Sequence, residues 1–389
     1  MRSVFYSAFD VVPSPKGAST HITYFTRGLV EAGYQVQIAT PGTSGLPDRE
    51  DYFGAQLIRL PVSHEANYLQ NALEFAEAVM QAIQKTPNIT IAHFRSVWDG
   101  YLIGQAKERF GYRTVFEVNG LPSIELKYHY PALKDQPVLA KIKQQEIATL
   151  LMADAIVCPS GVTRAYLASL GAPRERITVI PNGVDTKLFT PRPVTASRSG
   201  PYMLLYVGTL ADWQGLDVLV RALAELRTHK PVRLRVVGHA RSRQRKDFLK
   251  RARKLGLEDC VSLEPGIPHH EIPDLLAQAD VCVAPLAYND RNVTQGCCPI
   301  KIIEYMACGR PLVAANLPVV RELVREDRDA LLFTPDDPSD LARCITAILD
   351  DPELAARLSA SAARRAHERF SWRTAQKKLL RVYEQLLSE

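Results

Sequence analysis

The sequence lacks the features that would place it among membrane-spanning or disulfide-rich secreted proteins. No run approaches the roughly 18 apolar residues that a membrane-spanning helix needs. Near the N-terminus, Arg2 is a lone cation and Asp10 interrupts a short apolar stretch, which argues against a secretory signal. The seven cysteines form an odd set without a Cys-x-x-Cys pair, so neither a disulfide framework nor a zinc site is expected. These absences favour a cytoplasmic protein.

Two phosphate-binding motifs are also absent. There is no G-x-G-x-x-G, which counts against a nicotinamide or flavin Rossmann site, and no G-x-x-x-x-G-K-[ST] of a P-loop. The chain instead has the composition of an ordinary globular protein, with 46% apolar, 23% charged and 8% aromatic residues. Its 389 residues predict two domains.

The net charge of +6 is too small over this length to indicate a nucleic-acid-binding protein. It is unevenly spread, because residues 221–254 hold 13 Lys and Arg against two acidic residues. In this segment Phe248, Leu249 and Leu255 have helical spacing, which predicts a helix with one buried side and a basic face. That face is either simply solvated or contacts anionic lipid headgroups or a phosphorylated, lipid-linked acceptor. Residues 134–151 are a second candidate membrane surface, although their apolar residues fit the core stripe of a helix better.

Apolar strands alternate with helices in both halves of the chain. Residues 4–9 predict a strand, and residues 36–40 predict a second one. Between them we expect a helix that begins near Ser19 or Thr20 and ends at Gly33. The second half repeats this order, and most of its strands end in Gly, Pro or Asn. Such alternation predicts parallel sheets covered by helices on both faces, with ligands bound at the carboxyl edge of the strands.

A stretch rich in Pro, Ser, Thr and Gly at residues 190–201 separates the two halves. We therefore predict an α/β protein with two doubly wound, Rossmann-like domains facing across a cleft. The predicted parts are an N-terminal domain 1–185, a linker 186–200, a C-terminal domain 201–368, and a helix 369–389 that packs back on the N-terminal domain.

The most specific stretch is 295–315, QGCCPIKIIEYMACGRPLVAA. A turn-prone lead-in precedes a predicted helix with Pro299 near its first turn, where proline is tolerated. The backbone N–H groups and the dipole at such a helix start favour a phosphate group. Lys301 places a cation in that first turn, which is unfavourable unless an anion offsets the dipole. Glu304 follows on the same helix face, so the two side chains could also form an ordinary surface ion pair.

Residues 304–309, Glu-Tyr-Met-Ala-Cys-Gly, resemble the second half of the donor-nucleotide motif of the retaining glycosyltransferases of family 4, which have the GT-B fold. Residues 299–306 resemble a subgroup whose motif reads Pro-x-Lys-x-x-Glu-Tyr-Met. Other segments resemble family signatures in the same order, namely 17–21, 178–191, 205–223, 261–285 and 370–386. The resemblance spans nearly the whole chain. It implies metal-independent transfer of a sugar from a nucleotide sugar, most simply a UDP-sugar, with retention at the anomeric carbon.

Carried over residue by residue, the resemblance implies donor binding by the C-terminal domain and acceptor binding by the N-terminal domain. Glu304 would accept hydrogen bonds from the ribose hydroxyls, and the backbone around Gly266 and Ile267 would hold the base. Gly17 would let its loop approach the sugar or diphosphate, where a side chain would clash. The other donor-binding residues implied are Gly208, Thr209, Gln214, Cys297, Cys298, Pro299 and Ile300.

The sequence departs from the family pattern at four places. Gly296 stands where the motif has its first glutamate. The two basic residues of the phosphate clamp fall near Thr209 or Leu210 and at Gln214. The histidine of the N-terminal domain falls at Asn119. Since two cations are lost from one loop and two are gained beside the diphosphate turn, we hypothesise that Lys301, together with Arg291, replaces the clamp.

The candidate catalytic residues are Lys301, Asn119, His21 and Glu117. His21 begins a predicted helix beside the glycine loop, and Glu117 and Asn119 share one face of a strand that leads into Gly120. These two side chains either line the site or stabilise the loop by a hydrogen bond. His93, with Arg95 close by, ends another apolar strand and is either at the same edge or a structural histidine.

The resulting prediction is a retaining glycosyltransferase that transfers a sugar to a glycan, a lipid-linked sugar or a small molecule. A sugar-nucleotide 2-epimerase of GT-B fold and a degenerate, donor-binding homologue are the alternatives. We expect no metal and no cofactor beyond the nucleotide-sugar co-substrate. The expected partners are the donor and the acceptor, without nucleic acid, and peripheral contact with an anionic membrane at its inner face stays open.

Overall fold

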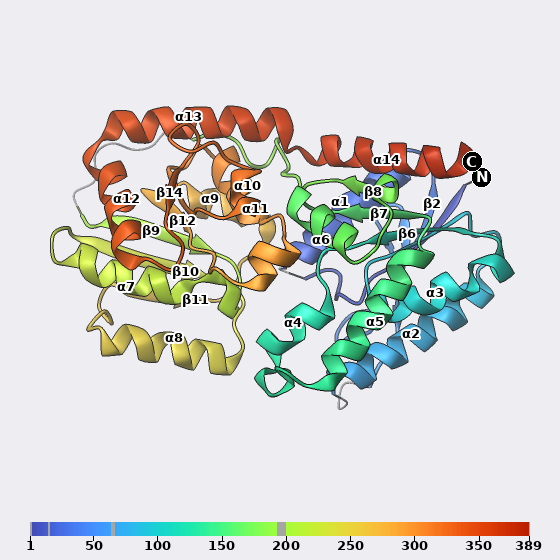
Figure 1. Cartoon of the computed structure of the whole chain (residues 1–389). Coiled ribbons are helices and arrows are strands. Elements are labelled where there is room, and N and C mark those ends of the chain that lie inside the picture. Colours follow the sequence, from blue (N-terminus) through green and yellow to red (C-terminus); the bar gives the residue numbers. More distant parts are fainter. Residues whose placement is uncertain (1, 15, 64–66, 193–199, 389) are drawn as a thin grey trace. The chain divides into compact units, whose positions relative to one another are not determined.

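The computed structural model describes residues 2–14, 16–63, 67–192 and 200–388 (Figure 1). The chain divides into two compact units. Unit 1 comprises Met1–Pro181, Gln295–Cys297 and Trp372–Glu389, and unit 2 comprises Asn182–Thr294 and Cys298–Ser371. Of the predicted linker 186–200, residues 193–199 lie outside the described residues.

Unit 1 is built on an eight-stranded sheet with the order β3-β4-β2-β1-β5-β6-β7-β8. Neighbouring strands are parallel except β3 and β4, which pair antiparallel. The strands are β1 (Ser3–Ser7), β2 (Gln35–Pro41), β3 (Arg49–Tyr52), β4 (Ala55–Leu60), β5 (Ile91–Phe94), β6 (Arg113–Glu117), β7 (Ala155–Cys158) and β8 (Ile177–Val179).

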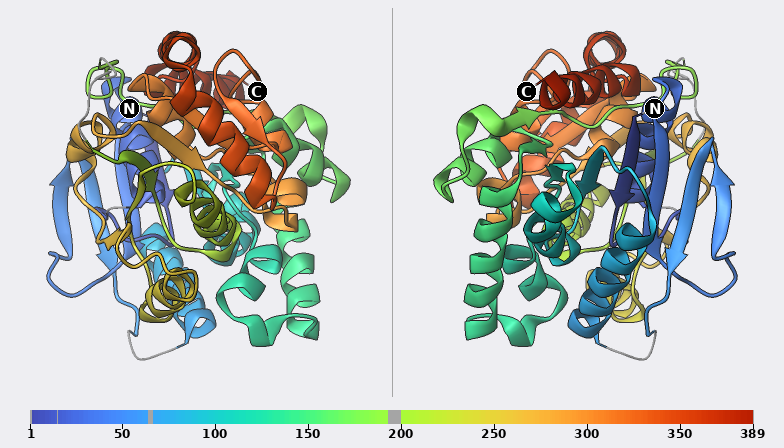
Figure 2. Two further views of the ribbon diagram at one scale, coloured as in Figure 1. Left: turned by 90° about the vertical axis from the view of Figure 1, so that its left-hand side faces the viewer. Right: turned by 90° about the vertical axis from the view of Figure 1, so that its right-hand side faces the viewer.

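Helices cover both faces of this sheet (Figures 1 and 2). The helices of unit 1 are α1 (Gly17–Glu31), α2 (Tyr68–Lys85), α3 (Val97–Phe110), α4 (Pro122–His129), α5 (Pro137–Met152), α6 (Gly161–Ser169) and α14 (Trp372–Ser388). Helices α2, α3 and α5 bury one core, which includes Phe75, Phe94 and Phe116. The chain passes from β1 to β2 through α1, in the direction opposite to its passage through α2, α3 and α5. A right-handed crossover therefore places α1 on the other face of the sheet. There it packs with α14, and Trp372 stacks on Tyr24 with 5.0 Å between the ring centroids.

Unit 2 has a six-stranded, wholly parallel sheet with the order β11-β10-β9-β12-β13-β14. Its strands are β9 (Tyr202–Val207), β10 (Val232–Val237), β11 (Val261–Glu264), β12 (Val281–Ala284), β13 (Leu312–Ala315) and β14 (Leu331–Phe333). Its helices are α7 (Leu216–Arg227), α8 (Ser242–Lys254), α9 (Ile272–Leu276), α10 (Ile300–Ala307), α11 (Pro318–Arg321), α12 (Pro338–Asp350) and α13 (Pro352–Arg369). The strand order changes direction between β9 and β12, which is the switch point where open α/β sheets bind ligands.

The predicted pair of Rossmann-like α/β domains with parallel sheets is confirmed, but one local prediction is wrong and one hairpin was not predicted. Helix α1 begins at Gly17, with Lys16 at its N-cap, and not at Ser19 or Thr20. The reason is that the Ser19 hydroxyl accepts a hydrogen bond from the Ser14 N–H at 2.9 Å and closes the preceding loop, so it does not cap the helix. The hairpin of β3 and β4 was not predicted, because the polar sequence of β3 has no apolar strand pattern.

Candidate functional site

Two glycines bring the ends of β9 and β10 into contact at the carboxyl edge of the unit 2 sheet. Gly208 follows β9 with φ +149°, and Gly238 follows β10. A Cβ atom added to Gly238 would lie 1.8 Å from the Gly208 carbonyl oxygen, and one added to Gly208 would lie 2.7 Å from Lys301 Nζ. Both positions therefore favour glycine, and the backbone of these two residues reaches the sheet edge close to Lys301.

Lys301, in the first turn of α10, places its ammonium group over this edge. Lys301 Nζ donates to Tyr206 Oη and to Gln214 Oε1, at 2.7 Å in each case, and lies 4.0 Å from the centroid of the Tyr206 ring. The Tyr206 hydroxyl in turn donates to the Thr209 carbonyl oxygen at 2.6 Å. Burial raises the pKa of Tyr206 well above its usual value, so the phenol stays neutral. The cation is thus held by neutral groups, and its positive charge is not cancelled by these contacts.

Arg291 supplies a second cation near the same turn. Its guanidinium carbon lies 5.1 Å from the centroid of the Trp213 ring, and its Nη1 donates to Asn292 Oδ1 at 3.1 Å. The Asn292 side-chain amide donates to the Trp213 carbonyl oxygen at 2.8 Å. Gly215 is packed so tightly against this loop that an added Cβ would lie 1.8 Å from the Pro285 carbonyl oxygen. The structure therefore brings Arg291 and Lys301 to the short turn that contains Gln214.

Glu304, one turn after Lys301, forms a pair with His269. His269 Nε2 lies 2.7 Å from Glu304 Oε1. The histidine ring also packs on the buried ring of Phe189, with 5.1 Å between the centroids. The Glu304 side chain is almost buried, whereas about a third of the His269 side chain is accessible. A ligand that reaches Glu304 therefore also meets His269.

The remaining predicted donor-binding residues have mixed environments. Gly266 is exposed and Ile267 half-buried, and a Cβ on Gly266 would meet no atom closer than 3.8 Å. Pro299 and Ile300 are half-buried at the start of α10. Thr209 is half-buried beside Gly208, and its carbonyl oxygen takes the Tyr206 hydroxyl.

Two predicted residues of the turn before α10 are buried and belong to different units. Cys297 is part of unit 1, whereas Cys298 is part of unit 2. The Asn182 side-chain amide donates to the Cys298 carbonyl oxygen at 2.6 Å.

A buried carboxylate organises the carboxyl edge of the unit 1 sheet. Glu117 ends β6, and its side chain is almost fully buried. Five side chains approach its two oxygens: His21 Nε2 at 2.8 Å, His93 Nε2 at 3.1 Å, Arg95 Nε at 3.3 Å, Tyr6 Oη at 2.8 Å, and the amide nitrogen of Asn119. The structure thus brings His21, Glu117 and Asn119 together, and adds His93 and Arg95 to them.

Burial and neighbouring charges shift the pKa values of the groups in this cluster. Burial by itself would raise the pKa of Glu117, but His21 and Arg95 hold the pKa of this carboxyl well below its usual range. Burial lowers the pKa of His93, so that ring is neutral at pH 7. Its other nitrogen lies 2.7 Å from the hydroxyl of Tyr383 in α14. Asn119 is half-buried and Gly17 is exposed at the start of α1, whereas His21 and Glu117 are nearly inaccessible.

The sequence did not single out Tyr206, His269 or Tyr6. Tyr206 and Tyr6 read as apolar strand residues, and nothing local marks their hydroxyls. His269 lies next to a second histidine in the predicted base-binding segment, and only the fold distinguishes them: His269 meets Glu304, whereas His270 is exposed.

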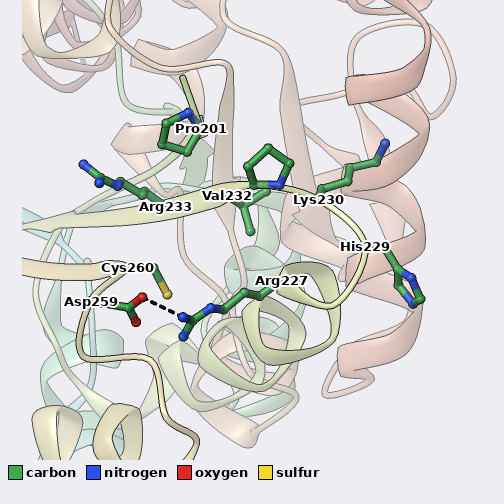
Figure 3. Close-up of a pocket in the computed structure, with 9 residues that line it drawn as sticks. Pro201, Arg227, His229, Lys230, Val232, Arg233, Asp259 and Cys260 are labelled. Atoms are coloured by element: carbon green, nitrogen blue, oxygen red, sulfur yellow. Dashed lines mark hydrogen bonds and ion pairs between the residues drawn. The ribbon is translucent and has the colours of Figure 1, made fainter. Parts of the chain in front are cut away.

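A separate hollow lies at the opposite, amino edge of the unit 2 sheet (Figure 3). It is lined by Pro201, Val232 and Cys260, where β9, β10 and β11 begin, together with several cations. Figure 3 shows Arg227 held by Asp259, at 2.6 Å. Because open α/β sheets bind ligands at the carboxyl edge, we do not assign the donor to this hollow.

Two searches of the described residues were negative. In the ranges that the structure describes, no three His, Cys, Asp or Glu side chains are grouped so as to hold a metal ion. Within the same ranges, no helix has the length and apolar character required to cross a membrane.

Comparison with known protein families matches both halves of the chain. Residues 15–188 match Glycosyltransferase Family 4, and residues 190–365 match Glycosyl transferases group 1. The D-inositol 3-phosphate glycosyltransferase of Thermobispora bispora is 28% identical over 95% of this chain and 90% of its own length. The MMP alpha-(1->4)-mannosyltransferase of Mycolicibacterium hassiacum is 28% identical over 64% of this chain and 57% of its own length.

Solved structures share the fold over the full length. Sucrose-phosphate synthase from Thermosynechococcus elongatus has a TM-score of 0.83 at 22% identity and covers all of both chains. Anabaena HepE in complex with UDP-glucose has a TM-score of 0.79 at 18% identity, also over all of both chains. With one glycosyltransferase family matching each half and these structures matching the fold, the chain belongs to the GT-B glycosyltransferases that join a family 4 domain to a group 1 domain.

Proposed function

We propose that the protein is a retaining, metal-independent glycosyltransferase that uses a nucleoside diphosphate sugar, with UDP as the expected nucleotide. The observation that carries the proposal is the placement of Lys301. A cation in the first turn of a helix is unfavourable by itself, because it opposes the helix dipole. Here it sits above glycine backbone at the carboxyl edge of a parallel sheet, where a bound diphosphate would offset the cost.

In this proposal, unit 2 binds the donor. Lys301 and Arg291 oppose the negative charge that accumulates on the diphosphate as the bond to the sugar breaks. The contacts with Tyr206 and Gln214 hold the Lys301 ammonium in place before the reaction, so little reorganisation is needed when charge develops. Glu304 accepts hydrogen bonds from the ribose hydroxyls, and the backbone at Gly266 and Ile267 holds the base.

Unit 1 takes the acceptor at the edge organised by Glu117. The Asn119 amide donates to Glu117, which leaves its carbonyl oxygen to accept a hydrogen bond from a sugar hydroxyl. His21 and Glu117 are almost fully buried, so we assign them to positioning Asn119 and give the substrate contact to Asn119.

The acceptor class is a glycan, a lipid-linked sugar or a small molecule. The relative from Thermobispora bispora is named for an inositol phosphate acceptor, which adds phosphorylated cyclitols to the small molecules worth testing. UDP is favoured as the nucleotide because HepE, which shares the fold, was solved with UDP-glucose.

A donor panel tests the proposal. The purified protein is incubated with UDP-, GDP- and ADP-sugars, first without an acceptor and then with inositol phosphates, oligosaccharides and lipid-linked sugars. Slow release of one nucleoside diphosphate that an acceptor accelerates would support the proposed sugar transfer. An α-linked product from an α-linked donor would support retention. Conversion of the donor to its 2-epimer would instead identify an epimerase, and binding without turnover a degenerate homologue. Activity that disappears in EDTA and returns with a divalent cation would overturn the metal-independent part.

A further inference from the structure

Helix α8 carries the densest charge of the chain. Residues 241–254 contain eight Arg and Lys but one acidic residue, Asp247. Figures 1 and 2 show α8 on the outer side of unit 2, beyond α7 and β11. This placement leaves most of the helix surface open to solvent.

The helix is anchored to unit 2 by a narrow apolar side. Phe248 and Ala252, one turn apart, are its two buried residues. The opposite side bears Arg243, Lys246, Lys250 and Arg253, whose spacing of three, four and three residues makes one straight basic stripe. All four are exposed. We call these four residues the basic stripe.

Nearby acidic groups neutralise little of this charge. Arg243 Nε lies 3.7 Å from Asp247, and Arg253 Nε lies 3.3 Å from Glu258. Both arginine side chains are more than three-quarters exposed, and ion pairs at such positions contribute little. Within the described residues, Lys246 and Lys250 have no acidic partner.

Two features of this charge distribution disfavour the helix by itself. Lys246, Lys250 and Lys254 repel one another at i, i+4 spacing. Arg243 and Arg245 lie near the N-terminus of the helix, where the dipole disfavours cations. An extended anionic surface would relieve both effects at once.

The exposed residues favour lipid over nucleic acid. No aromatic side chain is exposed between residues 241 and 255, so α8 offers nothing on which bases could stack. Leu249, beside the basic stripe, is 39% exposed. Cations beside an exposed leucine suit a surface that offers both anionic headgroups and an apolar edge.

We propose that the basic stripe of α8 binds anionic phospholipid headgroups and holds unit 2 on a membrane surface. Charge complementarity supplies the attraction, and Leu249 contacts the edge of the acyl region. The interaction is independent of the donor site, because none of these residues belongs to it. The proposal assigns membrane binding to α8 and not to the lysines of α5, the second candidate membrane surface in the sequence.

Vesicle flotation tests the proposal with the full-length protein. The protein is mixed at 0.1 M salt with vesicles of phosphatidylcholine alone, or with 30% phosphatidylglycerol. We expect flotation with the anionic vesicles only, and loss of flotation at 0.5 M salt, where exposed charges are screened. The variant K246Q/K250Q should bind the anionic vesicles about 25-fold more weakly, since each cation near such a surface contributes roughly fivefold.

The matched control is K141Q/K143Q, which removes two exposed lysines from α5. This variant should float like the wild type, and neither variant should melt at a lower temperature than the wild type. The proposal would be overturned if the two variants lost flotation equally. It would also be overturned if the wild type floated equally with neutral vesicles, or did not float at all. So would binding of a single-stranded oligonucleotide as tightly as the anionic vesicles at the same salt concentration.

Discussion

The ammonium nitrogen of Lys301 lies 2.7 Å from the side-chain oxygen of Gln214. Gln214 stands where the family resemblance expects a basic residue of the phosphate clamp. A cation from α10 therefore reaches the place where the loop after β9 has lost one. This contact supports the hypothesis that Lys301 replaces the missing basic residue of the phosphate clamp.

Removing the Lys301 charge should slow sugar transfer. We expect Lys301→Ala to lower kcat/KM for the donor at least tenfold, because a contact with the developing diphosphate charge would be lost. Moving the cation to the neighbouring position, in the double variant Q214K/K301A, should recover part of that loss. Steady-state kinetics of nucleotide release measure both. Activity of Lys301→Ala within about twofold of wild type would refute the role.

The contact between the ends of β9 and β10 should not tolerate a side chain. We expect Gly238→Ala to destabilise unit 2 by about 2 kcal/mol, because its Cβ would overlap the Gly208 carbonyl oxygen at 1.8 Å. Gly266→Ala is the matched control, since its Cβ would have no neighbour closer than 3.8 Å. It should change stability by less than about 0.5 kcal/mol. Urea unfolding measures both, and equal effects would show that the overlap relaxes without cost.

The pair of His269 and Glu304 should matter for donor affinity. His269→Ala leaves the nearly buried Glu304 carboxylate without its 2.7 Å partner, so the carboxylate should no longer be held in one orientation. We expect the KM for the donor to rise about tenfold, with a smaller change in kcat. His270→Ala, next to it but exposed, should behave like wild type. A fall in kcat alone would contradict a binding role.

The carboxylate of Glu117 should hold unit 1 together. Glu117→Gln removes the negative charge that faces His21 and Arg95, so we expect a loss of ~3–5 kcal/mol in the free energy of unfolding at pH 7. Glu108→Gln, on the exposed surface of α3, should change it by less than ~0.5 kcal/mol. Denaturant unfolding of both variants decides the point. A small effect of Glu117→Gln would mean that the cluster rearranges around the amide.

A second buried carboxyl in unit 1 should make stability depend on pH. Burial raises the pKa of Asp99 to about 6, while the Ser7 hydroxyl donates to its Oδ2. A carboxyl whose folded pKa exceeds its unfolded value binds its proton more tightly when folded, so stability falls as pH rises between the two values. We expect a loss of about 2 kcal/mol between pH 4 and pH 7. Asp99→Asn should abolish that part of the pH dependence, which urea unfolding at a series of pH values measures.

Much of the architecture could be predicted from local sequence patterns. The alternation of apolar strands with helices, and the Gly, Pro and Asn that end most strands, depend on neighbouring residues only. They were sufficient to predict two Rossmann-like domains with parallel sheets. The start of α1 was missed because Ser19 closes a loop instead of capping the helix, and both roles suit the same side chain. The β3–β4 hairpin was missed because its first strand is polar.

Local patterns predicted the class of fold and the position of the basic helix, and the motifs carried the family resemblance. Which side chains meet depends on the tertiary fold. Lys301 and Gln214 are 87 residues apart, and His269 and Glu304 are 35 apart. Such pairs depend on the order of strands in the sheet and on the direction of each crossover, which no local pattern encodes. The strand order places β9 beside β12, and that adjacency brings α10 to the glycine turn after β9 and its cation to Gln214.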